Sequence, residues 1–333
     1  MISIDPLFHF HAPLSFIKYE LNDERYQNNG IARHFSYDAL STGTSMTENI
    51  KTSQIDSLFG TNTIKCSFMG GSYSEIDSII KTALASKNDV RLVIRATDQF
   101  DLIKDPNFHI SNDPSRDYDY PWFLSDKNIL NDVKYVFNKA LMADLVTDLF
   151  RTKAGTPTTS FDEYAYWGDM FTYSKDTVLS SYVRPSVSDT RQFFSDEDRR
   201  LVFDNITQNV ISTANAYPNT EFIIWIPPYS IAYYDIEQRN GLLQRDLDAM
   251  EYELELLTAV PNIKVYCFAD RDDIVCDLNN YKDVQHFSPS ISAELIENIH
   301  NNVGLITKDN YVDYMTHVKN KYLNYDYESI YNP

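Results

Sequence analysis

Short apolar runs alternate with longer amphipathic stretches along most of this chain. Each apolar run is followed by polar or small residues, a pattern typical of parallel strands that are covered on both faces. We therefore expect buried strands in five ranges, namely 36–43, 62–69, 90–97, 220–228 and 262–269.

The stretches between these runs carry apolar residues at helical spacing. The clearest are 74–86, 195–214 and 241–259, of which 195–214 opens with a serine cap and an acidic first turn. A further helix is expected at 128–150. Strands that alternate with helices predict an α/β fold, a three-layer α/β/α sandwich with a mostly parallel central sheet of about five strands.

The interval 101–219 is too long to be a single connection between strands. We expect it to be a large insertion over the strand ends, within a domain spanning 36–306 that has a lead segment at 1–35 and a tail at 307–333. Aromatic residues in its loops could stack on sugar rings or fill a small core of the insertion's own. They are Tyr118, Tyr120, Trp122, Tyr164, Tyr166 and Trp167.

The charge balance limits the classes of partner. The formal net charge of −19 argues against nucleic acid, whose phosphates require a basic footprint, and against attraction to anionic lipid. Neutral or cationic partners, including sugars, remain compatible with it. No apolar run approaches the roughly 20 residues that span a bilayer.

No cofactor or metal is expected. The cysteines, Cys66, Cys267 and Cys276, lack the spacing of a zinc site. His9 and His11 alternate as in a strand and have no obvious ligand partners. The acidic run 270–277 lacks the glycine and terminal glutamate of a calcium loop, so a solvated turn is the better interpretation.

Ser45 follows the first expected strand and has two interpretations. The sequence Ser45-Met-Thr-Glu48 fits a capping box, in which the serine only caps its helix. Alternatively, the strand-to-helix turn places Ser45 at the edge of the sheet where α/β folds bind ligands. Local sequence does not decide between a cap and a nucleophile.

A second candidate lies between the last expected strand and the last core helix. Asp283 and His286 are three positions apart, just before a helix that Ser288 or Ser290 could cap. This spacing can place a carboxylate beside an imidazole, an arrangement that holds one tautomer of a catalytic base.

Taken together, three features resemble the SGNH/GDSL hydrolase superfamily, which has a flavodoxin-like sheet. They are Gly43-Thr-Ser45 after the first strand, Gly70-Gly71 after the second, and Asp283-x-x-His286 before the last helix. Within the superfamily, the chain is similar to the cell-envelope branch that includes the D-alanylation protein of teichoic acids and the alginate O-acetylation proteins. The resemblance covers about residues 36–100 and 218–302.

The α/β-hydrolase family is a poorer match. Its nucleophile lies in a G-x-S-x-G turn, whereas this chain has Thr47 in place of the second glycine.

The resemblance implies a role for each matched residue. Ser45 would attack an ester carbonyl, His286 would be its base, and Asp283 would orient the histidine. The oxyanion hole would use the backbone N–H of Ser45 and one from Gly70 or Gly71, because a glycine turn lets the backbone approach the substrate closely.

One position departs from the family pattern. Many members supply a third oxyanion donor from an asparagine after the third strand, where this chain has Asp98, and an ionised carboxylate cannot donate. Either the hole has two donors, or Asp98 does something else, such as pairing with Arg95 or holding a turn. Tyr229 and Ser230, after the fourth strand, are candidates to line the cleft.

The function implied by the resemblance is serine-dependent acyl transfer, with O-acetyl as the group transferred, onto an extracellular glycan or glycopolymer through an acyl-Ser45 intermediate. A membrane-bound acyltransferase would be the acyl donor. The protein would act outside the cytoplasmic membrane, with an N-terminal anchor that this sequence lacks. Two alternatives remain: a carbohydrate esterase with the same triad, and a non-catalytic glycan-binding or assembly protein on the same scaffold.

Overall fold

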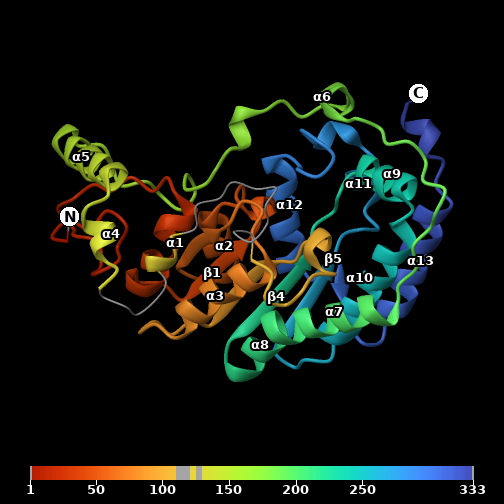
Figure 1. Cartoon of the computed structure of the whole chain (residues 1–333), viewed down its shortest axis with the longest axis horizontal. Helices are drawn as coiled ribbons and strands as arrows, with labels where there is room; N and C mark the ends of the chain where they lie inside the picture. The colour runs from red at the N-terminus through yellow and green to blue at the C-terminus, as the bar shows by residue number, and fades with distance from the viewer. Residues whose placement is uncertain (1, 110–120, 125–129, 332–333) are drawn as a thin grey trace.

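The computed structural model describes residues 2–109, 121–124 and 130–331, and within them a six-stranded sheet forms the centre (Figure 1). The strand order is β2-β1-β3-β4-β5-β6, with β1 to β5 parallel and the short β6 antiparallel. The strands are β1 Ala39–Gly43, β2 Thr63–Ser67, β3 Leu92–Ala96, β4 Glu221–Ile226, β5 Ile263–Cys267 and β6 Leu305–Ile306. The predicted mostly parallel sheet is confirmed, with one strand more than expected.

Helices form layers on both faces of the sheet, which confirms the three-layer fold (Figure 1). Two helices that contact each other share one layer, α2 Thr52–Phe59 and α12 Pro289–His300. The other layer contains α1 Glu24–His34, α3 Tyr73–Leu84, α7 Asp196–Ile206, α8 Ser212–Ala216, α10 Leu243–Leu257 and α13 Tyr311–Leu323. The remaining helices are α4 Val133–Val136, α5 Lys139–Ala154, α6 Lys175–Ser181, α9 Ile231–Asn240 and α11 Asp272–Val275.

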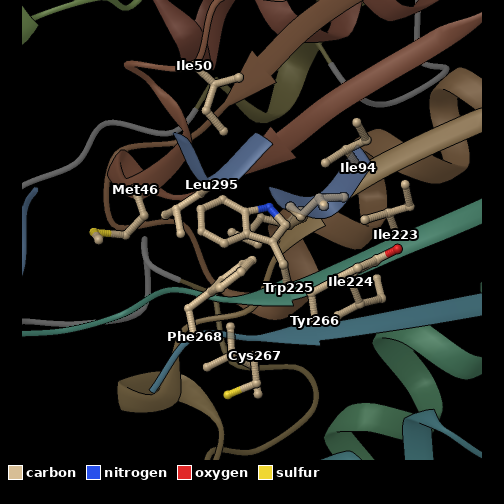
Figure 2. Packing of buried hydrophobic residues seen from close by; sticks show 14 of the residues in the cluster. Met46, Ile50, Ile94, Ile223, Ile224, Trp225, Tyr266, Cys267, Phe268 and Leu295 are labelled. Carbon is tan, nitrogen blue, oxygen red and sulfur yellow. The ribbon is translucent and has the colours of Figure 1, made fainter. Parts of the chain in front are cut away.

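The main core lies around the central strands. In β4, Ile223, Ile224 and Trp225 are all fully buried, because both faces of the strand are covered by helices. Figure 2 shows these three side chains with Leu295 of α12 and with Met46, the residue after Ser45. The turn that carries Ser45 is therefore anchored in the core by its own neighbour.

The range expected to be an insertion contains one helical run that belongs to the sheet's cover. Residues 196–216 form α7, a π-helical segment Thr207–Ile211 and α8, and the run packs against α10. At the π segment, the buried Arg95 of β3 donates to the carbonyl oxygen of Asn209 at 2.5 Å. Residues 196–216 are therefore part of the helical layer and not of an elaboration over the strand ends.

The helix predicted over 128–150 is wrong in its continuity. Residues 128 and 129 lie outside the described residues, and the rest forms two helices, α4 and α5, interrupted at Phe137 and Asn138. The side chain of Asn138 accepts from the N–H of Leu141 at 3.4 Å, which is the bond of a helix cap. An asparagine in this position starts a new helix instead of continuing the old one.

The lead segment and the tail both contribute helices to the layers. In the lead segment, α1 packs against α3 and β2, with Asp23 as its N-cap, and in the tail α13 packs against α10. His9 pairs with Asp132 at 3.0 Å, and His11 contacts backbone carbonyls.

Within the described part of the chain, there is no cluster of three or more side chains that could hold a metal ion. In the acidic run, Asp273 pairs with Arg271 and Asp272 with Lys321. No helix among the described residues is both long and apolar enough to cross a bilayer.

Candidate active site

The carboxyl ends of the parallel strands meet at one edge of the sheet, where a cavity of about 1040 Å³ opens. Ser45 follows β1, Gly70 follows β2, Asp98 follows β3 and Tyr229 follows β4, while His286 lies in the segment between β5 and α12. All five line this cavity. Residues far apart in the sequence converge here because parallel strands all end at the same edge.

Ser45 is the first residue of a short 3₁₀ helix, Ser45–Thr47, whose N-cap is Thr44. The hydroxyl of Ser45 lies 2.8 Å from Nε2 of His286, and Thr44 makes the capping bond, accepting from the N–H of Met46 at 3.3 Å. Glu48 does not return to the helix start, since its carboxylate accepts from Trp167. The capping-box interpretation of Ser45 is therefore wrong.

His286 is held by a tight loop that Asp283 organises. One oxygen of Asp283, Oδ1, accepts from the backbone N–H groups of Gln285 and His286, at 2.9 and 2.8 Å. Both carboxylate oxygens lie within 2.9 Å of Nδ1 of His286. The structure thus brings the three predicted residues, Ser45, His286 and Asp283, into one row.

The charge of Asp283 determines which imidazole nitrogen carries the proton. Burial alone would raise the pKa of this carboxyl, but hydrogen bonds from His286 and Lys282 hold it well below its usual range. An ionised carboxylate only accepts, so Nδ1 of His286 is the donor. The neutral ring then has its lone pair on Nε2, facing the hydroxyl of Ser45.

Lys282 extends this arrangement to the cavity wall. Its ammonium donates to Oδ2 of Asp283 at 2.8 Å and lies over the rings of Trp167 and Phe171, at 4.7 and 4.5 Å from their centroids. The ring of Trp167 also meets that of His286 edge to face, with centroids 5.5 Å apart. The histidine is therefore fixed from two sides, by a carboxylate and by an indole.

Two of the three predicted oxyanion donors remain candidates. Within the described residues, the N–H of Ser45 donates to no protein acceptor, and Gly70 lines the cavity with a φ of 62° that favours glycine. Gly71 is a wrong prediction, because its N–H is used inside the turn, where it donates to the carbonyl of Phe68 at 2.8 Å.

Asp98 holds two hydroxyl groups instead of pairing with Arg95. Its carboxylate accepts from Thr44 Oγ1 at 2.5 Å and from the hydroxyl of Tyr229. Burial raises the pKa of Asp98, and these two hydrogen bonds offset part of that rise. The residue therefore fixes Thr44, the neighbour of Ser45, and ties the ends of β1, β3 and β4 together.

We expect Asp98→Ala to weaken both the fold and the site. Buried hydroxyls that lose their partner cost about 1–3 kcal/mol, so denaturant unfolding should show a loss of that size. Because Thr44 precedes Ser45, labelling of Ser45 by an activated phosphonate should slow by about 10-fold or more. Asp98→Asn, which keeps one acceptor, should lose less of both. Equal labelling rates in all three proteins would show that Asp98 does not position the serine.

Part of the aromatic segment forms a wall of the cavity. Tyr166 and Trp167 line it, whereas Tyr164 is buried and donates to Asn28 Oδ1 at 2.9 Å. The insertion thus does both things considered from its sequence, filling a core and lining the site. Tyr118, Tyr120 and the side chain of Trp122 lie outside the described residues.

Ser230 is a wrong prediction for the cleft. It is fully buried and does not line the cavity, and its hydroxyl donates to the carbonyl of Val284 at 2.7 Å, which ties α9 to the loop of His286. Sequence reasoning also missed Glu24, Glu48 and Lys282, which do line the cavity. The latter two adjoin recognised motifs, and that adjacency was the available signal.

Comparisons with known proteins give little additional information. No family model matches the chain, and no curated protein matches it. One matching solved structure is described as "The structure of a putative platelet activating factor from Streptococcus pneumonia", with a TM-score of 0.42 and 11% identity over 84% of this chain and 91% of that one. Similarity at this level transfers no activity.

Proposed function

We propose that this protein is a serine-dependent acyl-transfer enzyme that moves an acyl group, acetyl in the first instance, onto a hydroxyl of an extracellular glycan. The observation that carries the proposal is the row formed by Ser45, His286 and Asp283. Its two links, hydroxyl to Nε2 and Nδ1 to carboxylate, both measure 2.8 Å at their shortest, and the serine and histidine line a large cavity.

The reaction would proceed in two displacements. Nε2 of His286 takes the proton of Ser45 as Oγ bonds to the ester carbonyl carbon, and the oxyanion receives the N–H of Ser45 and that of Gly70. The same proton then passes to the departing alcohol, leaving an acyl-Ser45 ester. In the second displacement, His286 takes a proton from the acceptor hydroxyl as its oxygen bonds to the acyl carbon. The bond between the acyl carbon and Oγ then breaks, and Nε2 returns the proton to Ser45.

The cavity supports a sugar as the acceptor. Tyr166 and Trp167 offer aromatic rings, and Asn22 and Asp23, which also line the cavity, supply polar groups for hydroxyls. The proposal extends to a membrane-bound acyltransferase as acyl donor and to a location outside the cytoplasmic membrane, in line with the resemblance of the Ser45, Asp283 and His286 motifs.

A fluorophosphonate probe tests the nucleophile directly. The probe should form one covalent adduct per chain, and peptide mass spectrometry should place it on Ser45. Heat-unfolded protein is the control, since an unfolded serine has no base beside it. An adduct on another serine, or none on the folded protein, would contradict the proposal and favour a glycan-binding protein on this scaffold.

Transfer and hydrolysis are separated by the effect of an acceptor. We expect slow turnover of p-nitrophenyl acetate in buffer and faster turnover when a suitable oligosaccharide is added, because a well-held hydroxyl has an effective molarity of about 10⁵ M or more. Release of p-nitrophenol and mass spectrometry of the acetylated sugar give the two rates. Rapid turnover that no sugar in a panel accelerates would identify an esterase.

A further inference from the structure

Two acidic side chains that the proposed reaction does not use lie at the cavity beside Ser45. Glu24 is the first residue of α1, and Glu48 follows the short helix that begins at Ser45. Both line the cavity. Glu24 precedes β1 in the sequence and Glu48 follows it. One oxygen of each carboxyl, Oε1, is buried.

Glu24 holds the turn that carries Gly70. Its Oε2 accepts from the backbone N–H of Met69 at 2.9 Å, and the neighbouring Arg25 donates to the carbonyl oxygen of Met69 at 2.9 Å. Both polar groups of Met69 are therefore fixed by the start of α1. The peptide bond to Gly70, the candidate oxyanion donor, is oriented as a consequence.

Glu48 holds the indole that packs against the histidine. Its Oε2 accepts from Nε1 of Trp167 at 2.5 Å, and Trp167 meets the ring of His286 edge to face. The carboxylate of Glu48, three positions after Ser45, thus helps to fix the position of this wall of the cavity.

The second oxygen of each carboxyl is buried without a donor from the described part of the chain. Among the described residues, Glu24 Oε1 and Glu48 Oε1 are buried and have no hydrogen-bond donor. Burial raises the pKa of Glu48, and hydrogen bonds with Trp167 and with the carboxyl of Glu24 offset part of that rise. Two buried carboxylates cannot both ionise at low cost, whereas one proton between them satisfies both inner oxygens.

We propose that Glu24 and Glu48 share one proton and act as paired positioning residues, joining the turn of Gly70 to the indole wall that orients His286. This inference rests on the proposed function for its catalytic consequence, but the pairing itself does not depend on it. Neither residue touches the reacting atoms, so each acts through Met69 or Trp167.

The surrounding charges are compatible with one negative charge on the pair. Lys65 donates to the carbonyl oxygens of Glu48 and Ile50 from inside the core, and Arg25 forms an ion pair with Glu75. Other titratable groups that influence Glu24, Glu48 or Lys65 are Asp162, Cys66 and Tyr164. Burial raises the pKa of the Cys66 thiol and of Tyr164 well above their usual ranges, so both stay neutral near pH 8.

The shared proton gives the site a defined pH dependence. Burial raises the pKa of Glu24 to about 8, and burial raises that of Glu48 as well. The proton is therefore held at neutral pH and is lost as pH rises through the raised pKa of Glu24. Above that pH, two adjacent carboxylates repel each other, and Met69 and Trp167 lose their fixed positions.

Glutamine substitutions separate this proposal from a general structural role. In Glu24→Gln, the amide oxygen can accept from Met69 while the amide N–H donates permanently to Glu48, so the pair persists at every pH. We expect its rate of p-nitrophenyl acetate turnover at neutral pH to stay within about 3-fold of the parent rate. The parent protein should lose kcat above about pH 8, and Glu24→Gln should not. Glu24→Ala should lower kcat by about 10-fold or more, with KM little changed.

Two controls address other titrating groups. Burial lowers the pKa of Lys65 to about 8, so its titration falls in the same range, but an alkaline loss caused by Lys65 would persist in Glu24→Gln. Glu237 is a matched carboxyl whose pKa is also raised by burial and by Asp246, outside this cavity. Glu237→Gln should leave the alkaline loss as it is in the parent.

An NMR measurement on a catalytically inactive variant tests the pairing of Glu24 and Glu48 separately from the proposed function. The indole N–H resonance of Trp167, assigned with Trp167→Phe and followed by ¹⁵N NMR in the Ser45→Ala protein, should titrate near pH 8 and stop doing so in Glu24→Gln. An indole signal that is flat with pH, or that titrates equally in Glu24→Gln, would overturn the inference. Titration without any ester turnover would support the pair and reject the proposed enzyme.

Discussion

Ser45→Ala should abolish turnover of p-nitrophenyl acetate and of any natural acyl donor. The methyl group cannot form an acyl intermediate, and within the described residues no other nucleophile lies at Nε2 of His286. Loss of the nucleophile in a concerted triad lowers kcat by on the order of 10⁴-fold or more. Only the residual rate due to substrate binding and the oxyanion hole is left. Stopped and continuous assays of p-nitrophenol release measure the effect.

A matched serine substitution shows whether that loss is specific. Ser53 of α2 is exposed and bonds Asp162, away from the row of Ser45 and His286. Ser53→Ala should keep the parent rate, and both variants should unfold at nearly the same denaturant concentration. Ester turnover that survives in Ser45→Ala would show that the chemistry resides elsewhere, and the whole assignment of the cavity would fail.

Asp283→Asn should cost nearly as much without removing a reacting atom. An asparagine can still accept from the backbone at its oxygen, but its N–H₂ then faces Nδ1 of His286 and Lys282. Nδ1 becomes an acceptor, so the proton moves to Nε2 and the lone pair no longer faces Ser45. The wrong tautomer lowers kcat by on the order of 10³- to 10⁴-fold in triads of this kind.

The measurement for Asp283 is kcat over a range of pH, together with the rate of phosphonate labelling at Ser45. Asp277→Asn is the control, because Asp277 accepts from Asn279 in the same segment but lies outside the cavity. It should keep the parent activity. A loss of less than about 10-fold in Asp283→Asn would mean that the carboxylate does not determine the tautomer.

The sheet could be predicted because burial on both faces leaves a clear signal in sequence. Runs such as 220–228 are apolar without alternation, and only a covered parallel strand explains a run of that length between helical patterns. The edge of the sheet at which the candidate site lies could be predicted from the same pattern, since parallel strands place their carboxyl ends together. Ser45 and His286, 241 positions apart, could be placed near each other on that basis and by resemblance.

Other features depended on partners that local sequence does not name. Asp98 could have paired with Arg95, three positions earlier at the end of the same strand. It accepts instead from Thr44 and Tyr229, which follow other strands and reach it only when the sheet is assembled. Gly70 and Gly71 are neighbours that the sequence does not distinguish, and only the folded turn shows that the N–H of Gly71 donates to the carbonyl oxygen of Phe68.

The sequence by itself determined the layered α/β architecture, because periodic burial is a local property of the chain. It made Ser45, Asp283 and His286 candidates through their positions at strand ends and through the resemblance of their motifs. Tertiary structure alone decided whether Ser45 caps a helix or faces an imidazole. It also decided that Glu24 and Glu48 meet beside it. The physical reason is that a hydrogen bond or a shared proton belongs to two groups at once, and only the packed chain fixes which two groups are within reach.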